Sequence, residues 1–155
     1  MLKLIVTILA LLSTTAFADG SYSGTWRGKS YQASISETFD YVRGHWGEEQ
    51  FDFSVSETFQ YVRGQLPGGH VDITVSKTFS YVRGNLPCGH TDFSYSTTFK
   101  YIRGQLCGES FEINVTDEEE VVATARAVLF EELMADFPMP LRGVIRHFIR
   151  SKLEF

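Results

Sequence analysis

Four arginines recur at one position of a repeated motif, and of all residues in this chain they are best suited to binding an anion. Each lies two residues after a tyrosine and directly before a glycine, and successive copies are twenty residues apart. A planar guanidinium group donates several hydrogen bonds, so a row of them can hold an anionic polymer by repeated contact. Tyrosine rings beside them can stack on sugars. The candidate ligand-binding residues are Arg43, Arg63, Arg83 and Arg103 with Tyr41, Tyr61, Tyr81 and Tyr101.

A structural role for these arginines is the preferred interpretation. An acidic residue also recurs every twenty residues, at Asp52, Asp72, Asp92 and Glu112. If each arginine pairs with the acidic residue of the next unit, the pairs hold the repeats in register and bind nothing else. Structural ion pairs of this kind are common, so we prefer this interpretation to ligand binding.

The other residues whose side chains could bind a metal or take part in catalysis are not arranged as a site. His70 and His90 share one repeat position and Cys88 is close to the second, but the other units carry Gln50 and Ser110 there. A metal site needs more ligands than this, so we predict polar turn residues and no metal or cofactor. No nucleophile elbow, phosphate loop or supported acid–base pair is present, and we predict that the protein is not an enzyme.

The start of the chain predicts export. Lys3 precedes the apolar run Leu4–Leu12, and Ala16-Phe17-Ala18 fits a signal-peptidase site, so residues 1–18 are interpreted as a signal peptide. The protein is then periplasmic, cell-surface or extracellular. In that setting Cys88 and Cys107 can pair as one disulfide. The net charge of −5 argues against nucleic acid as a partner.

Residues 19–116 are predicted to form a β-repeat domain. Alternating apolar and polar residues such as Val71, Asp72, Ile73 and Thr74 indicate strands, and Pro-Gly-rich segments indicate turns.

Two architectures fit this pattern: a β-solenoid with one coil per unit, and an antiparallel meander or barrel with one hairpin per unit. Stacked like charges favour the meander. The cysteines favour the solenoid, because one coil step brings their Cα atoms into disulfide range, whereas two strand widths would require the loops to bend together. We predict the solenoid. The phenylalanine of each Thr-Phe pair and the Trp or Leu before each turn are expected to fill one continuous interior.

Residues 117–155 are predicted to form two amphipathic helices that cap the repeats. The first follows acidic residues at 117–120 and ends at Pro138, and the second begins near Pro140. Arg142, Arg146 and Arg150 lie on one face of the second helix. Such a face can contact an anionic membrane through residues 140–153. Packing of this basic helix against the acidic first helix is preferred, because it neutralises both.

The segment Tyr81-Val82-Arg83-Gly84-Asn85-Leu86, followed after a short turn by an alternating strand, resembles the half-repeats of bacterial putative-adhesin β-solenoids. The resemblance covers residues 21–116 and implies an envelope scaffold without a catalytic site. We therefore expect an exported structural or binding module, adhesin-like, whose repeat face holds an anionic polymer, a glycan or an envelope protein. The alternative is an antiparallel barrel or sheet that encloses a small apolar ligand.

Overall fold

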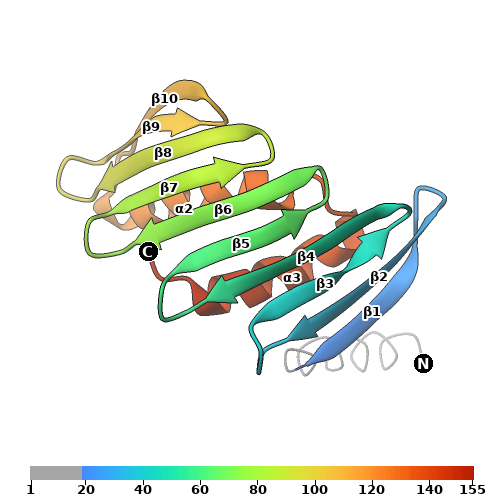
Figure 1. Ribbon diagram of the computed structural model, residues 1–155. Coiled ribbons are helices and arrows are strands. Elements are labelled where there is room, and N and C mark those ends of the chain that lie inside the picture. The colour runs from blue at the N-terminus through green and yellow to red at the C-terminus, as the bar shows by residue number, and fades with distance from the viewer. Residues whose placement is uncertain (1–18) are drawn as a thin grey trace, which may run out of the picture.

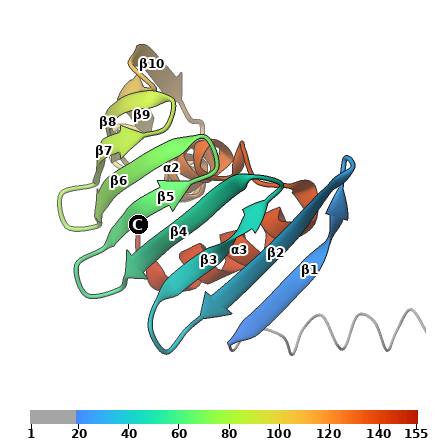
Figure 2. The ribbon, with the colours of Figure 1, turned by 45° about the vertical axis from the view of Figure 1, so that its right-hand side comes forward.

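The computed structural model describes residues 19–155, which form a ten-stranded antiparallel sheet and two helices (Figures 1 and 2). The predicted signal peptide lies outside the described residues. The strands are β1 (Gly20–Trp26), β2 (Lys29–Ser36), β3 (Tyr41–Trp46), β4 (Glu49–Ser56), β5 (Tyr61–Leu66), β6 (Gly69–Ser76), β7 (Tyr81–Leu86), β8 (Gly89–Ser96), β9 (Tyr101–Leu106) and β10 (Glu109–Asn114). The helices are α2 (Glu118–Met134) and α3 (Met139–Lys152).

Each repeat unit is a hairpin of a meander. Every strand pairs with the strands before and after it in the chain, and β1 and β10 are the open edges of the sheet. The predicted mainly β fold with C-terminal helices is confirmed, but the predicted solenoid is not. In a solenoid, equivalent strands of successive units would pair, whereas here β6 separates β5 from β7. The meander alternative fits, while the closed barrel does not, because the sheet is open.

The arrangement of charges agrees with this outcome. In the register of the hairpins, Arg63 faces Asp72 on one side and Ser54 on the other. The same pairing recurs in the units before and after it, so opposite charges face one another and like charges are kept apart. Coil-on-coil stacking would have placed arginine beside arginine, which is destabilising.

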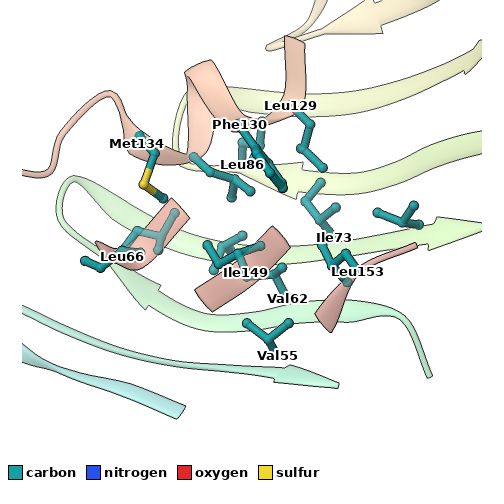
Figure 3. Close-up of a cluster of buried hydrophobic side chains, with 14 of the residues drawn as sticks. Val55, Val62, Leu66, Ile73, Leu86, Leu129, Phe130, Met134, Ile149 and Leu153 are labelled. Carbon is teal, nitrogen blue, oxygen red and sulfur yellow. The ribbon is translucent and has the colours of Figure 1, made fainter. Parts of the chain in front are cut away.

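The alternation within each strand divides the sheet into a buried and an exposed face. Val71, Ile73 and Val75 of β6 are buried, while the intervening residues point to the opposite face. The buried face meets apolar residues of both helices, as Figure 3 shows for Leu66, Ile73, Leu129, Met134 and Ile149. Burial of apolar surface at about 25 cal/mol per Å² is the main stabilising term for such a two-layer arrangement.

The two helices cover one face of the sheet. α2 lies against β7, β8 and β9, and α3 lies against β1, β2 and β4 (Figures 1 and 2). The two predicted helices are present, but their position differs from the prediction. The sequence predicted that they cap the end of a repeat array, whereas they cover a face of the sheet. Neither helix is long and apolar enough to cross a membrane.

Part of the predicted interior is wrong, because the Thr-Phe pairs lie in exposed turns. Leu66 and Leu86 are buried as expected. The four phenylalanines are 72–77% exposed, and they lie in the four-residue turns at one end of the sheet: Phe39, Phe59, Phe79 and Phe99. The turn places them beyond the end of the strand pair, where no second layer can cover them.

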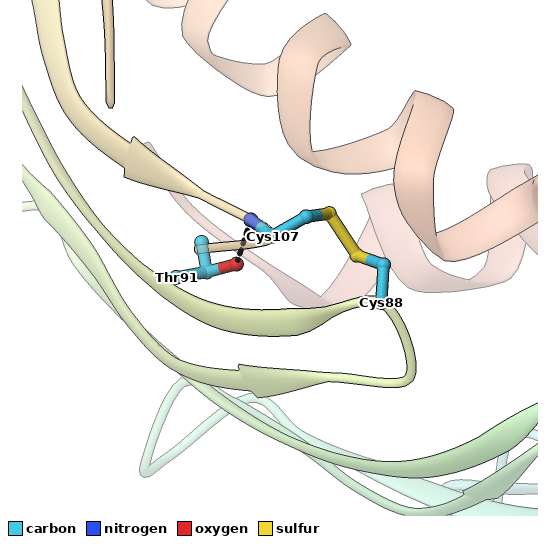
Figure 4. The surroundings of a disulfide bond; sticks show 3 residues. All are labelled: Cys88, Thr91 and Cys107. Atoms are coloured by element: carbon cyan, nitrogen blue, oxygen red, sulfur yellow. Dashed lines mark hydrogen bonds between the residues drawn. A yellow bond between two sulfur atoms is a disulfide. The ribbon is translucent and has the colours of Figure 1, made fainter. Parts of the chain in front are cut away.

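A disulfide joins Cys88, in the β7–β8 turn, to Cys107, in the β9–β10 turn (Figure 4). The two turns do bend together, which the sequence argument treated as the obstacle to a meander. The amide of Cys107 donates to Thr91 Oγ1 at 3.3 Å, and the amide of Gly108 donates to the carbonyl of His90 at 2.7 Å. These bonds fold the later turn onto the start of β8 and bring the cysteine Cα atoms to 5.0 Å. The pair is compatible with an oxidising, exported compartment.

We expect the unreduced protein to be lighter by two hydrogens than the dithiol, and reduction to lower the free energy of unfolding by about 3 kcal/mol, because the bond closes a loop of moderate length. Intact mass and urea titration with and without reductant measure both effects. The double variant C88S/C107S is the control and should not respond to reductant. Free thiols in protein freshly isolated from an oxidising compartment would contradict the pairing.

The end of α3 is fastened to the β2–β3 turn by Lys152. Its ammonium group lies 2.9 Å from a carboxylate oxygen of Asp40. That hydrogen bond, with further attraction from nearby carboxylates, raises the pKa of Lys152 against the opposing effect of its burial. A raised pKa means that this contribution to stability is complete below the ordinary value of 10.5 and is lost as the pH rises through the folded value.

Candidate functional site

The face of the sheet opposite the helices carries a ladder of paired charges. Nε of the arginine donates to the acidic partner on the next strand in three hairpins, at 3.0 Å for Arg43–Asp52, 2.8 Å for Arg63–Asp72 and 3.1 Å for Arg83–Asp92. In the last unit, Arg103 faces Glu112 in register. We call this set of arginines, their acidic partners and the adjoining tyrosines the outer ladder.

Each arginine of the outer ladder also stacks on the tyrosine two residues before it. The guanidinium carbon lies 4.2–4.5 Å from the ring centre in all four units. Residues two apart on a strand point to the same face, so the Tyr-x-Arg spacing itself produces the stack. The tyrosines are therefore partly covered, and a ligand meets the arginine–tyrosine pair rather than a free ring face.

The outer ladder remains accessible although its charges are paired. The side chains of Arg63 and Asp72 are 53% and 50% exposed. Only Nε is used in each ion pair, and a guanidinium group has five N–H donors, so the terminal donors remain for a ligand. Exposed ion pairs contribute little to stability, about 0–1 kcal/mol each, so register is set mainly by the buried face.

The repeat units are offset as well as separated. Tyr61 pairs with Thr74 across β5 and β6, whereas Tyr81 pairs with Ser76 across β6 and β7. Equivalent residues are thus two strands apart and shifted by two residues along the strand, which places them about 12 Å apart. The outer ladder runs diagonally across the sheet.

No family model, curated protein or solved structure matches this chain.

The exposed phenylalanines form a second regular row. They lie in the turns that join β2–β3, β4–β5, β6–β7 and β8–β9, and Figure 1 shows these turns at one end of the sheet. The amide of Phe59 donates to Ser56 Oγ at 3.0 Å, and the same bond recurs in the other three turns. The residue after each phenylalanine has a positive φ of 50–56°. One backbone conformation is thus repeated four times, and the four rings, which we call the phenylalanine row, are presented alike.

The phenylalanine row is continuous with the outer ladder. A shallow depression of about 560 Å³ is lined by Phe39 together with Tyr41, Arg43 and Asp52. A second, of about 580 Å³, lies between Phe59 and Phe79. Further along the ladder, Arg83, Asp92 and Arg103 line a third depression of about 510 Å³. Aromatic rings, donors and acceptors thus alternate over one surface.

The structure brings the predicted arginines and tyrosines together on one face but adds the phenylalanines, which sequence reasoning placed in the core. The missed signal was position: each phenylalanine lies outside the alternating segments, flanked by polar residues in a turn. His70 and His90 are exposed on the ladder face, opposite Gln65 and Asn85. The thiolate of Cys88 cannot serve as a metal ligand beside His90 while it is bonded to Cys107.

Proposed function

We propose that the protein is an exported, non-catalytic binding module that holds an extended glycan of low net charge on its uncovered sheet face. The observation that carries the proposal is the phenylalanine row, 72–77% exposed in four turns of the same backbone conformation and continuous with the outer ladder. Large apolar side chains gathered on a surface commonly mark a binding site.

The chemistry of this surface suits a sugar polymer. The apolar C–H face of a sugar ring can pack on an exposed aromatic ring. Each arginine–carboxylate pair offers donors and acceptors side by side, which matches the mixed hydrogen-bonding capacity of neighbouring hydroxyl groups. Since the units repeat about every 12 Å, several weak contacts can act together along one chain.

Charge favours a neutral glycan over a polyanion. Three of the four ladder arginines are paired with aspartate, and the fourth faces Glu112, so the ladder has little excess positive charge. The whole chain is acidic, with a net charge of −5. A polyanion would have to displace or approach the carboxylates, which is unfavourable at low ionic strength.

We expect the protein, with residues 1–18 removed, to be retained on at least one of immobilised cellulose, mannan and dextran, with retention that changes little between 0.05 and 0.5 M salt. (These salt concentrations are roughly the range over which exposed charges go from weakly to strongly screened.) F59A/F79A should weaken retention about tenfold, because it removes two of the four ring contacts. Frontal affinity chromatography measures both.

The matched control is M139A, which removes another exposed large apolar side chain, on α3 rather than on the ladder face. It should leave retention unchanged. Retention confined to dextran sulfate and lost in salt would instead identify a polyanion-binding ladder. R63Q/R83Q would then be the variant that abolishes it. No retention on any of the neutral polymers would refute the glycan proposal.

A further inference from the structure

A groove between α2 and α3 gathers three arginines that form no ion pair with an acidic residue in the described part of the chain, residues 19–155. It is lined by Arg126 and Phe130 of α2 and by Arg146 and Arg150 of α3, with Ala123, Ala127 and Glu131 completing the walls. Its volume is about 230 Å³. The groove belongs to the helical layer, on the other side of the sheet from the outer ladder. We call it the arginine groove.

Ion pairs between the acidic and basic side chains of the two helices are not seen in this groove within the described residues. Among the ion pairs within residues 19–155, none joins α2 to α3, and none includes Arg126, Arg146 or Arg150. The one acidic side chain of the groove, Glu131, therefore leaves the cluster with excess positive charge in a chain whose net charge is −5. Like charges held together in an acidic protein indicate a site for an anion.

The neighbouring Arg142 shows what a structural arginine does in this layer. Its Nε donates to the carbonyl of Phe137 at 2.9 Å, and its terminal nitrogen donates to the carbonyl of Ala135 at 3.0 Å. These bonds satisfy carbonyl groups at and just beyond the end of α2. Arg126, Arg146 and Arg150 make no comparable bond within the described chain, so the same explanation does not extend to them.

A second observation that supports an anion site is the environment of Arg126. Its Nε is buried and has no hydrogen-bond partner among the described residues. Its guanidinium carbon lies 5.5 Å from the centre of the Phe155 ring, which meets Phe130 edge-to-face and lies tilted beside Tyr95. Burial raises the pKa of the Tyr95 hydroxyl, while the neighbouring Ser80 side chain and the charge of Arg126 oppose that rise. The guanidinium group is thus held against an aromatic cluster with an unused donor, and such donors in folded proteins call for a partner.

The walls and volume of the groove indicate what kind of group can accompany the anion. Ala123 and Ala127 are small and exposed, and Phe130 is buried, so the groove combines apolar walls with cationic side chains. The volume is below the roughly 300–1,000 Å³ of sites that enclose a drug-sized molecule. A headgroup with the first atoms of a chain fits such a space, and the rest of the chain can extend along the open side.

We propose that the arginine groove binds the anionic headgroup of an amphiphile, a phosphate or carboxylate attached to an apolar chain. The arginines supply charge-assisted hydrogen bonds to the anion, and the alanines and Phe130 contact the first part of the chain. This site is independent of the glycan proposal, because it uses different residues on the opposite layer.

Titration of the protein with octyl phosphate, followed by calorimetry, tests the proposal. We expect saturable binding, competition by inorganic phosphate, and much weaker binding of octyl glucoside, which has the same chain without the charge. R146Q/R150Q should weaken octyl phosphate binding at least tenfold, since it removes two exposed cations and leaves the buried residues untouched. A127L should also weaken it, by filling the groove without changing its charge.

K100Q is the control, because it removes a positive charge in the β8–β9 turn, from a residue that does not line the groove. It should leave binding unchanged, and thermal melting of each variant confirms that the fold is retained. Equal affinity of octyl glucoside and octyl phosphate, unchanged binding by R146Q/R150Q, or no binding by the parent protein would overturn the proposal.

Co-sedimentation with phosphatidylglycerol but not phosphatidylcholine vesicles would place the headgroup in a membrane, and binding of octyl phosphate without co-sedimentation would identify a free amphiphile. Either result supports the shared chemistry.

Discussion

Replacement of Phe137 by alanine is expected to lower the free energy of unfolding by about 3–5 kcal/mol, the largest effect among the predictions made for this protein. The ring lies in the short link between α2 and α3 and is 1% exposed. Its centre is 5.1 Å from that of Phe51 and 6.1 Å from that of Phe53, both on β4. Its removal leaves a cavity between the helical layer and the sheet, where the rigid strands prevent collapse.

Urea titration measures this loss, and F79A is the matched control. The same atoms are removed from a ring that is 76% exposed, so the free energy of unfolding should change by less than about 0.5 kcal/mol. The pair of variants separates the stabilising phenylalanines from those proposed to bind a glycan. A loss below about 1 kcal/mol for F137A would show that the helices are not packed on the sheet as described.

Substitution of Gly84 by alanine is expected to cost roughly 4 kcal/mol, from a strained backbone and a steric overlap together. The residue has a φ of +143°, a conformation that side chains disfavour, and a Cβ atom there would overlap the carbonyl oxygen of Asp72 on the neighbouring strand. Relief would require β6 and β7 to separate, which would break ladder hydrogen bonds. The equivalent glycines at 64 and 104 have the same crowding from the strand before them.

The control for this substitution is G143A, within α3, where a Cβ atom would meet nothing within 4 Å. Alanine is favoured over glycine inside a helix, so the free energy of unfolding should rise by about 0.5–1 kcal/mol. Opposite signs for the two Gly-to-Ala changes are therefore expected in the same urea titration. A neutral G84A would mean that neighbouring strands do not approach as closely as the register requires.

The glycine of each Tyr-x-Arg-Gly motif illustrates how far sequence reasoning reaches. The repeat period showed that these glycines are equivalent, and the alternating pattern placed them within strands. That they permit close approach of the neighbouring backbone became visible only with the register of the sheet. A pattern in one strand carries no information about the atoms of the strand opposite.

The cysteines show how a correct pairing can support a wrong architecture. Cys88 and Cys107 were predicted to bond, and they do in the structure. The inference that this favours a solenoid rested on the two strand widths that separate equivalent turns of a meander, which the turns must bend together to span. In the structure, hydrogen bonds from the amides of Cys107 and Gly108 draw one turn over the next strand. Turn geometry of this kind depends on twist, which the sequence pattern does not encode locally.

By itself, the sequence determined the repeated β units, the two C-terminal helices and the facing of most apolar residues, because these follow from local periods of 2 and about 3.6 residues. Tertiary structure alone decided that the units are hairpins of an open sheet, that the helices cover one face, and that the phenylalanine row points to solvent. It also decided that three arginines from two helices meet in one groove. These properties depend on which segments lie side by side, and the free energies that select among such arrangements are sums over contacts between residues far apart in the chain.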